Sequence, residues 1–256
     1  EQVFSVEGGG LRTGFIGRAI QQPMVQTGGV VNAASGAVGN GVAPGSYISI
    51  FGAALADTTL AYSTQYLPLS LAGISVGFDV LSRRLSYPGR IHFVSPGQIN
   101  VQVPWELAGE AAVDLKVSFG DFSSAIVRIP LNDYSPAAFE YTDPGSGRLL
   151  AAALDQRFAL ATAANPLRRG EVVQIYANGV GPVDNRPLSG DPASNSVLSR
   201  CTFTPEVTIG GRPAPVQFCG LAPGFVGLYQ INATVPNDAP AGIQPLIIRA
   251  GGVTSK

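Results

Sequence analysis

The chain contains an internal repeat, and the two copies differ at their C-terminal sides. Residues 98–104 (QINVQVP) return as residues 230–236 (QINATVP), and in both copies a turn, an Ala-Gly pair and an alternating apolar run follow. The first copy then continues through another apolar stretch, 124–131, whereas the second ends at Lys256. A repeat of this length predicts two similar domains in tandem, the second without a counterpart of the first domain's last strand.

Turn-forming residues and short β-branched runs predict an all-β fold. The 256 residues include 32 Gly and 20 Pro, and their turn signals recur about every 8–12 residues, the spacing of a β-sandwich. We therefore expect an N-terminal extended arm at 1–22 and two tandem immunoglobulin-like β-sandwiches at 23–133 and 134–256. The arm has no counterpart in the second copy, and the glycine run 8–10 predicts a flexible joint within it.

One segment allows two interpretations. Residues 149–160 are rich in Ala and Leu, and Leu150, Leu154 and Phe158 recur at helical spacing. The same residues also fit two short strands around a turn at 155–157. The repeat favours the strands.

Charge and hydropathy argue against two classes of partner. The formal net charge is −1 and Lys and Arg form no cluster, so nucleic acid is not an expected partner. The longest apolar runs are far shorter than the roughly 20 residues that cross a bilayer, so membrane insertion is not expected either. The chain begins at Glu1 without an initiator Met, which suggests the processed end of a secreted protein.

The two cysteines, Cys201 and Cys219, flank a predicted strand and a Gly-Gly turn. This layout can place them across a hairpin within disulfide reach, which also favours a secreted, extracellular or cell-surface protein. Two buried free thiols are the alternative. A metal site would need further ligands, and His92 is the single histidine, so we expect no metal and no cofactor.

Catalytic constellations are weak throughout the chain. His92 lies in a strand pattern, where a solvent-facing side chain is expected more than a general base. The acidic pairs Glu106/Glu110 and Asp184/Asp191 fall in turns or loops, where solvated carboxylates are common. We therefore expect no enzyme.

Two features are candidates for a binding site. Trp105, Tyr62, Tyr66 and Tyr87 could form a platform for stacking sugars, with closure of the sandwich core as the alternative role of Trp105. The polar stretch 184–199 is the longest irregular segment, and long loops are often functional or mobile.

Four segments share a pattern with one known family: 30–35 (VVNAAS), 42–52, 94–105 (VSPGQINVQVPW) and 221–232 (LAPGFVGLYQIN). In order, they resemble the signature of an uncharacterised C-terminal domain that is abundant in secreted acidobacterial proteins. The resemblance covers roughly residues 23–255. It implies secretion and a β-rich extracellular module, and that family has no assigned activity or catalytic residues. Its members usually continue past the Gly-Gly-Val-Thr-Ser stretch at 251–255 into another short strand.

A sandwich without its terminal strand predicts self-assembly. Such a sandwich leaves unpaired backbone groups and an open apolar groove, which a strand from another copy can fill, as in donor-strand complementation. The contact does not close on itself and therefore generates a homopolymeric filament. The arm could instead fold back onto its own second domain, which would leave a monomer. The expected donor residues in the arm are Val3, Phe4, Val6, Leu11, Phe15, Ile16 and Ile20. The expected acceptor residues are Ile231, Ala233, Val235, Leu246, Ile248 and Ala250.

The alternative is a monomeric secreted adhesin or polysaccharide-binding module. Its site is expected in the loop 184–199 or around Trp105. Deleting residues 1–22 should leave such a module unchanged, whereas a filament subunit should lose its polymers.

Overall fold

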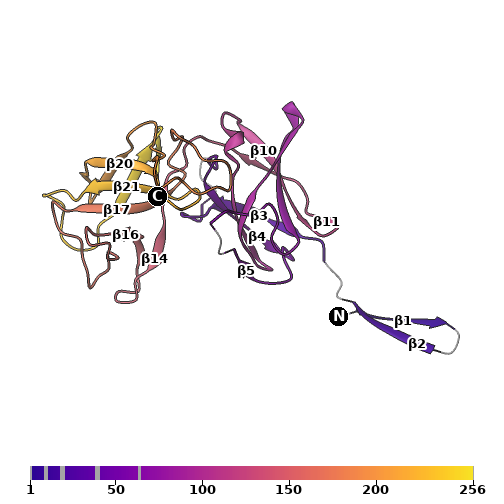
Figure 1. The fold of residues 1–256 in the computed structure, drawn as a ribbon. Helices are drawn as coiled ribbons and strands as arrows, with labels where there is room; N and C mark the ends of the chain where they lie inside the picture. Colours follow the sequence, from indigo (N-terminus) through magenta and orange to yellow (C-terminus); the bar gives the residue numbers. More distant parts are fainter. Residues whose placement is uncertain (1, 9–10, 18–20, 38–40, 63–64, 256) are drawn as a thin grey trace.

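The structure, a computed structural model, is built of antiparallel β-sheets (Figure 1). It describes residues 2–8, 11–17, 21–37, 41–62 and 65–255. The helical content of these residues is two short 3-10 turns, η1 (Leu81–Arg83) and η2 (Trp105–Leu107). No helix in these ranges is long and apolar enough to cross a membrane. The expected all-β fold is confirmed.

The predicted first domain contains two five-stranded sheets. One has the order β3-β4-β9-β8-β5: β3 (Met24–Asn32), β4 (Tyr47–Ala53), β9 (Gln98–Gln102), β8 (Arg90–Val94) and β5 (Leu60–Ala61). The other has the order β11-β10-β6-β7, with β12 also on β10: β11 (Phe122–Ser123), β10 (Ala112–Phe119), β6 (Ile74–Val80), β7 (Leu85–Pro88) and β12 (Val127–Pro130).

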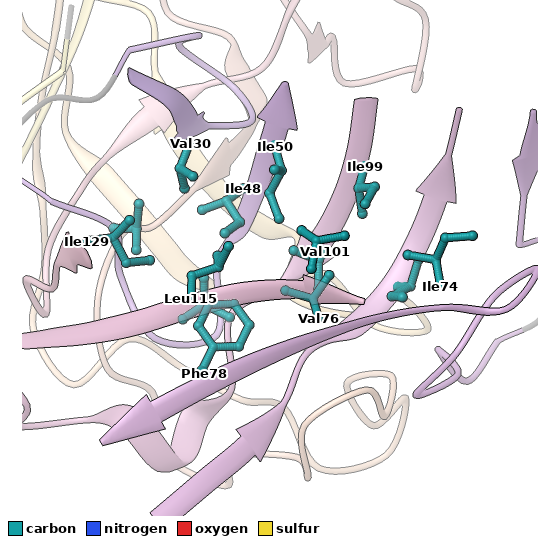
Figure 2. Packing of buried hydrophobic residues seen from close by; sticks show 14 of the residues in the cluster. Val30, Ile48, Ile50, Ile74, Val76, Phe78, Ile99, Val101, Leu115 and Ile129 are labelled. Atoms are coloured by element: carbon teal, nitrogen blue, oxygen red, sulfur yellow. The ribbon is translucent and has the colours of Figure 1, made fainter. Parts of the chain in front are cut away.

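Alternating apolar side chains form the core of this domain (Figure 2). Ile48 and Ile50 on β4 are fully buried, and they belong to the same cluster as Ile74 and Phe78 on β6. Because successive strand residues point to opposite faces, the same β4 directs Tyr47 and its alternate neighbours away from this core.

The predicted second domain contains three sheets. The central one has the order β13-β17-β21-β20, with β16 also on β17: β13 (Ala137–Ala138), β17 (Val172–Asn178), β21 (Tyr229–Thr234), β20 (Val216–Leu221) and β16 (Ala153–Leu154). The next has the order β19-β18-β22-β23: β19 (Arg212–Pro213), β18 (Glu206–Ile209), β22 (Leu246–Ala250) and β23 (Val253–Thr254). The third pairs β14 (Glu140–Thr142) with β15 (Leu149–Ala151). Segment 149–160 therefore forms strands and a turn, and the helical alternative is wrong.

The internal repeat has a structural counterpart. Gly45 N donates to the Val103 carbonyl at 2.8 Å, and Gly170 N donates to the Val235 carbonyl at the same distance. β4 and β9 thus correspond to β17 and β21. The division into two tandem domains and the immunoglobulin-like strand order stay predictions.

The central position of β21 corrects part of the expected acceptor groove. β21 pairs with β17 on one side and β20 on the other. Ile231, Ala233 and Val235 are consequently buried in the core of the second domain. A further strand would extend the other sheet, next to β22, so these three residues do not border an open groove.

The N-terminal segment is a β-hairpin, whereas we expected a single extended arm. β1 (Gln2–Gly8) pairs with β2 (Leu11–Gly17) from Gln2↔Gly17 to Gly8↔Leu11. The last two residues of the glycine run, 9–10, lie outside the described residues. Of the expected donor residues, β1 carries Val3, Phe4 and Val6, and β2 carries Leu11, Phe15 and Ile16. Ile20 lies outside the described residues.

Candidate functional site

A buried amide joins the two domains. Asn178, at the end of β17, is fully buried, and its Oδ1 accepts a hydrogen bond from Tyr47 N at 2.9 Å. Its Nδ2 lies 2.8 Å from the Tyr47 carbonyl and 2.9 Å from Asn32 Oδ1. Asn32 Nδ2 in turn donates to the Ser135 carbonyl at 2.8 Å. Because buried polar groups are costly unless paired, this network favours one arrangement of the two domains.

The loop 184–199 makes a second connection to the first domain. Gly190 N donates to Oε1 of the buried Gln102 at 2.7 Å, and Leu67 N donates to the Gly190 carbonyl at 2.9 Å. Ser189 Oγ accepts from Trp105 N at 2.9 Å and donates to Glu106 Oε2 at 2.6 Å. The longest irregular segment of the chain is thus an inter-domain contact, which the sequence pattern alone did not identify.

Trp105 has a packing role. Its side chain is only 3% exposed and belongs to the apolar cluster of the second domain, although the residue follows a strand of the first. Closure of a core was one of the two roles expected for it, and this burial agrees with that role. The side chain also lines a second, smaller cavity, so contact with a ligand stays a prediction. Of its proposed aromatic partners, Tyr87 packs against the first core and Tyr66 is exposed.

A cavity of about 660 Å³ lies between the two domains. Its lining combines aromatic, aliphatic and amide side chains from both of them. The first domain contributes Ala33, Tyr47, Tyr62, Gln65, Leu67, His92 and Asn100. The second contributes Phe139, Gly224, Phe225, Val226 and Leu228. This volume is in the range of about 300–1,000 Å³ that is typical of small-molecule sites.

The face of the β3-β4-β9-β8-β5 sheet that points away from the core forms the first wall. On this face, a β-bulge in β8 displaces His92: Ile91 pairs with Val101 and Phe93 pairs with Asn100, so His92 has no cross-strand partner in the register. Bulges redirect side chains and are common beside functional sites.

Two rings lie together on this wall. The Tyr47 and His92 rings meet edge to face, with their centroids 5.9 Å apart. Tyr62 N donates to the His92 carbonyl at 2.8 Å, and the Tyr62 side chain packs against the first core. Tyr62 was one of the aromatic residues expected to stack a ligand, and it lines the cavity.

An insertion in the second repeat forms the opposite wall. In the first copy Gln98 directly follows Gly97, whereas five residues, 225–229, separate Gly224 from Gln230 in the second. Phe225, 58% exposed, lies in this insertion and lines the cavity with its neighbours. The length difference between the copies was the sequence signal that could have located this wall.

Contacts with both domains hold the inserted loop. Gly224 N donates to the Ala193 carbonyl and Ala193 N to the Phe225 carbonyl, both at 2.9 Å. Gly227 has φ +60°, and a Cβ there would lie 2.6 Å from the Gly45 carbonyl oxygen. Only glycine therefore fits this close approach between the domains without a shift of the backbone.

The described residues that line the cavity include no acidic side chain, Lys or Arg. Desolvation by burial lowers the pKa of His92, which keeps the imidazole neutral at pH 7. Burial likewise raises the pKa of Tyr47, so its phenol is also neutral. The lining therefore favours an uncharged ligand, since a buried charge without a partner is costly.

Asn100 has a defined orientation on the first wall. Its Oδ1 accepts hydrogen bonds from Ser49 Oγ at 2.9 Å and from Gln98 Nε2 at 2.8 Å. No acceptor for its Nδ2 occurs among the described residues. The amide therefore offers the cavity an oriented donor.

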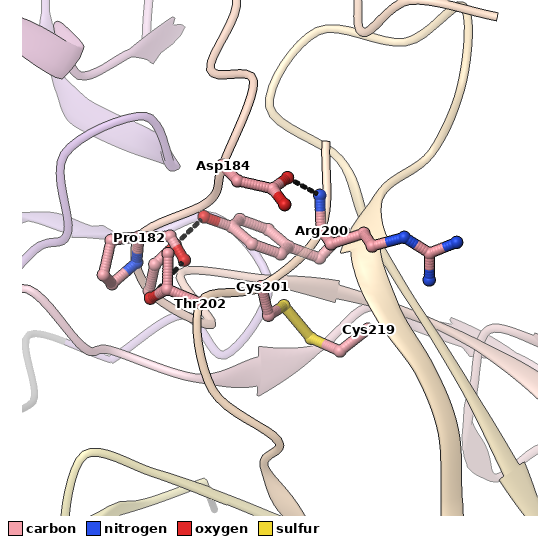
Figure 3. Close-up of a disulfide and its surroundings, with 8 residues drawn as sticks. Pro182, Asp184, Arg200, Cys201, Thr202 and Cys219 are labelled. Atoms are coloured by element: carbon pink, nitrogen blue, oxygen red, sulfur yellow. Dashed lines mark hydrogen bonds between the residues drawn. A yellow bond between two sulfur atoms is a disulfide. The ribbon is translucent and has the colours of Figure 1, made fainter. Parts of the chain in front are cut away.

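The disulfide between Cys201 and Cys219 is confirmed, with the two Cα atoms 5.3 Å apart (Figure 3). Cys201 follows the loop 184–199, and Cys219 lies on β20, which leads into the inserted loop. The bond thus joins the bases of two loops that position Phe225.

Three of the four residues in the acidic pairs have structural roles as hydrogen-bond acceptors or ion-pair partners: Glu106, Glu110 and Asp184. Glu106 accepts from Ser189, Glu110 lies 2.9 Å from Arg83, and Asp184 accepts from Arg200 N at 2.6 Å (Figure 3). Within the described ranges, no group of three His, Cys, Asp or Glu side chains could hold a metal ion.

A second candidate site is the edge of β22. Ser124 N donates to the Val117 carbonyl at 2.8 Å, and Val117 N donates to Ser124 Oγ at 3.1 Å. Ser255 and Ile248 repeat this reciprocal pair at 2.8 and 2.9 Å. The strands β10 and β22 and the turns that follow them therefore correspond up to these serines.

The domains differ beyond the serines. In the first, β12 pairs with β10 and covers Leu115, which is fully buried. In the part of the chain that the structure describes, no strand pairs with β22 at the equivalent place, and the corresponding Leu246 is only half-buried. Of the expected acceptor residues, Leu246 borders this edge, while Ile248 and Ala250 are buried.

A scan against models of protein families matched none of them, and a search of curated proteins returned no match.

Proposed function

We propose that this chain is a secreted binding module whose ligand occupies the cavity between the two domains. The observation that carries the proposal is the composition of the walls: an aromatic cluster on a bulged sheet face and an inserted loop meet across a domain interface. Buried hydrogen bonds of Asn178 and Gln102 hold that interface. A cavity assembled in this way exists before the ligand arrives, which lowers the entropic cost of binding.

The disulfide supports the extracellular part of the proposal. Disulfides persist in oxidising compartments and are rare in the cytosol, where thiols are kept reduced. Cys201 and Cys219 are the whole cysteine complement of the chain, and both are in the bond. In an oxidising compartment this bond would stay oxidised.

Phe225→Ala tests the binding proposal. The side chain is 58% exposed, so its removal should leave the fold intact while shortening one wall of the cavity. On an array of neutral glycans, acidic glycans and uncharged peptides, we expect probes that the wild type retains to be lost by this variant. The matched control is Phe122→Ala, a partly exposed Phe on β11 that does not line the cavity. Equal retention by Phe225→Ala and the wild type would contradict the proposal.

The edge of β22 favours a second candidate function, self-assembly into a head-to-tail homopolymer. In this candidate a strand of the N-terminal hairpin of one copy pairs with β22 of the next, and Leu246 becomes as buried as Leu115 is beneath β12. The unpaired edge is the observation that supports it, because exposed strand edges tend to recruit strands.

Negative-stain electron microscopy tests this candidate on the full chain and on a version without residues 1–22. Filaments that disappear on deletion would support assembly through the hairpin. Monomers in both samples would contradict it.

A further inference from the structure

The way the cavity presents its polar groups restricts the chemistry of a ligand. Tyr47, His92 and Asn100 project from one face of a sheet, and their strands β4, β8 and β9 have neighbours on both sides. A peptide that binds by strand addition needs an unpaired strand edge for its main-chain hydrogen bonds. This wall offers only side chains, so the ligand must be recognised by rings and amide groups.

Aromatic residues from both domains line the cavity. Tyr62 and the Tyr47–His92 pair belong to the first domain, whereas Phe139 and Phe225 belong to the second. A flat ligand with apolar C–H faces can stack on such rings, as sugar rings do. The hydroxyl groups at the edge of such a ligand need hydrogen-bond partners, because a buried hydroxyl without one is costly.

Asn100 and His92 can supply those partners. Asn100 Nδ2 is a donor, and the other polar atom of this amide is already engaged by Ser49 and Gln98. A neutral imidazole has one donor and one acceptor nitrogen. A hydroxyl group both donates and accepts, so these side chains match it better than they match a carboxylate, which only accepts.

The charge of the cavity lining limits the chemistry of the ligand further. Its described lining contains no Lys or Arg to pair with the carboxylate of a uronic acid. We propose, on the basis of the binding function above, that the ligand is a neutral oligosaccharide segment, stacked between the aromatic side chains of the two domains and hydrogen-bonded by Asn100 and His92. A cavity of about 660 Å³ holds more than one sugar ring.

Glycan binding by the full chain tests this inference. The probes are an array of neutral oligosaccharides, a matched set of uronic acid oligosaccharides and a set of uncharged peptides. Binding is followed by the imidazole NMR signal of His92, which is unambiguous because the chain has a single histidine. We expect at least one neutral oligosaccharide to shift this signal and the uronic acid set to leave it unchanged.

Two variants sharpen the test. Asn100→Asp keeps the oxygen that Ser49 and Gln98 contact, but it replaces the donor with a charged acceptor. This substitution should weaken the binding of the neutral oligosaccharide at least tenfold. Phe122→Ala, away from the cavity, should change nothing.

The binding function and the oligosaccharide inference are contradicted by different outcomes. If only peptides or only acidic glycans shift the His92 signal, the inference of a neutral oligosaccharide is overturned and the binding function stands. If a neutral oligosaccharide binds without moving His92, or binds Asn100→Asp equally well, the assignment to this cavity is overturned. If no probe of any class binds, both proposals are overturned.

Discussion

The side-chain amide of Asn178 hydrogen-bonds both backbone groups of Tyr47: it accepts from the nitrogen at 2.9 Å and donates to the carbonyl at 2.8 Å. The side chain of Asn178, in the second domain, thus holds the main chain of Tyr47, a residue of the first domain that lines the cavity. The position of the Tyr47 ring therefore depends on the domain interface, so changes at the interface should also affect the binding site.

Asn178→Ala should destabilise this interface. The substitution removes three hydrogen bonds and leaves the Tyr47 nitrogen without its partner, whereas the Tyr47 carbonyl still accepts from Ala33 N and Asn32 Oδ1 still accepts from Ala34 N. We expect the free energy of unfolding to fall by about 1–3 kcal/mol, the cost of one unsatisfied buried group. Urea denaturation measures it, with the exposed Asn195→Ala as the control. Equal midpoints for the two variants would refute a locking role for Asn178.

Gly227→Ala should force the domains apart. A Cβ at this position would lie 2.6 Å from the Gly45 carbonyl oxygen, which belongs to the other domain. Gly211→Ala is the matched control, because Gly211 also has a positive φ (+73°) but no atom within 4 Å of its ideal Cβ. Both variants carry the backbone strain, of order 1 kcal/mol, and only Gly227→Ala adds the inter-domain clash. We expect a clearly larger loss of thermal stability for Gly227→Ala, and equal losses would argue against close contact of the domains there.

The pKa of His92 gives a pH signature. Desolvation lowers this pKa below its usual value of 6.5, so the unfolded chain binds a proton more readily than the folded protein. Stability should therefore fall as the pH drops from about 6.5 through the pKa of the folded state, and it should recover as the pH rises.

NMR titration of the single imidazole measures this pKa directly. His92→Gln should flatten the pH dependence of stability in the same window, because carboxylates titrate at lower pH. A midpoint above 6.5 would show that the imidazole is not desolvated.

Removing the disulfide should loosen the loops behind the inserted wall. The bond closes a loop between residues 18 positions apart, and loss of such a bond typically costs about 2–4 kcal/mol. For Cys201→Ser/Cys219→Ser we expect faster hydrogen exchange at the amides of Ala193 and Phe225, which bond within these loops. Exchange should stay unchanged at Val101, in the first core. Unchanged exchange at the loop amides would mean that the disulfide does not support this wall.

The sequence predicts the secondary structure of the chain well, because strand alternation and turn residues act locally. The burial of Ile48 and Ile50 on β4, and of Ile175 on β17, follows directly from the period of two. The repeat likewise aligns the halves down to the equivalent serines, Ser124 and Ser255.

The candidate site depends on contacts that no local pattern encodes. Asn178 corresponds to Ala53 in the first copy, so a polar residue stands at the end of an otherwise apolar strand. Its role became clear only from the structure, which shows that it hydrogen-bonds Tyr47 in the other domain. Trp105 was ambiguous because its pocket belongs to the core of the other domain. The N-terminal hairpin was missed because the alternation of a lone strand resembles that of a paired one.

The central claim is that the cavity between the domains is the binding site, and backbone and side-chain NMR shift mapping tests it most directly. The full chain would be titrated with the oligosaccharide that the array selects. We predict that the largest shifts cluster at Tyr62, His92, Asn100 and Phe225, which line the cavity from both domains. Shifts confined to β22 or to the N-terminal hairpin, with these four residues unmoved, would contradict the claim and place the interaction at the strand edge.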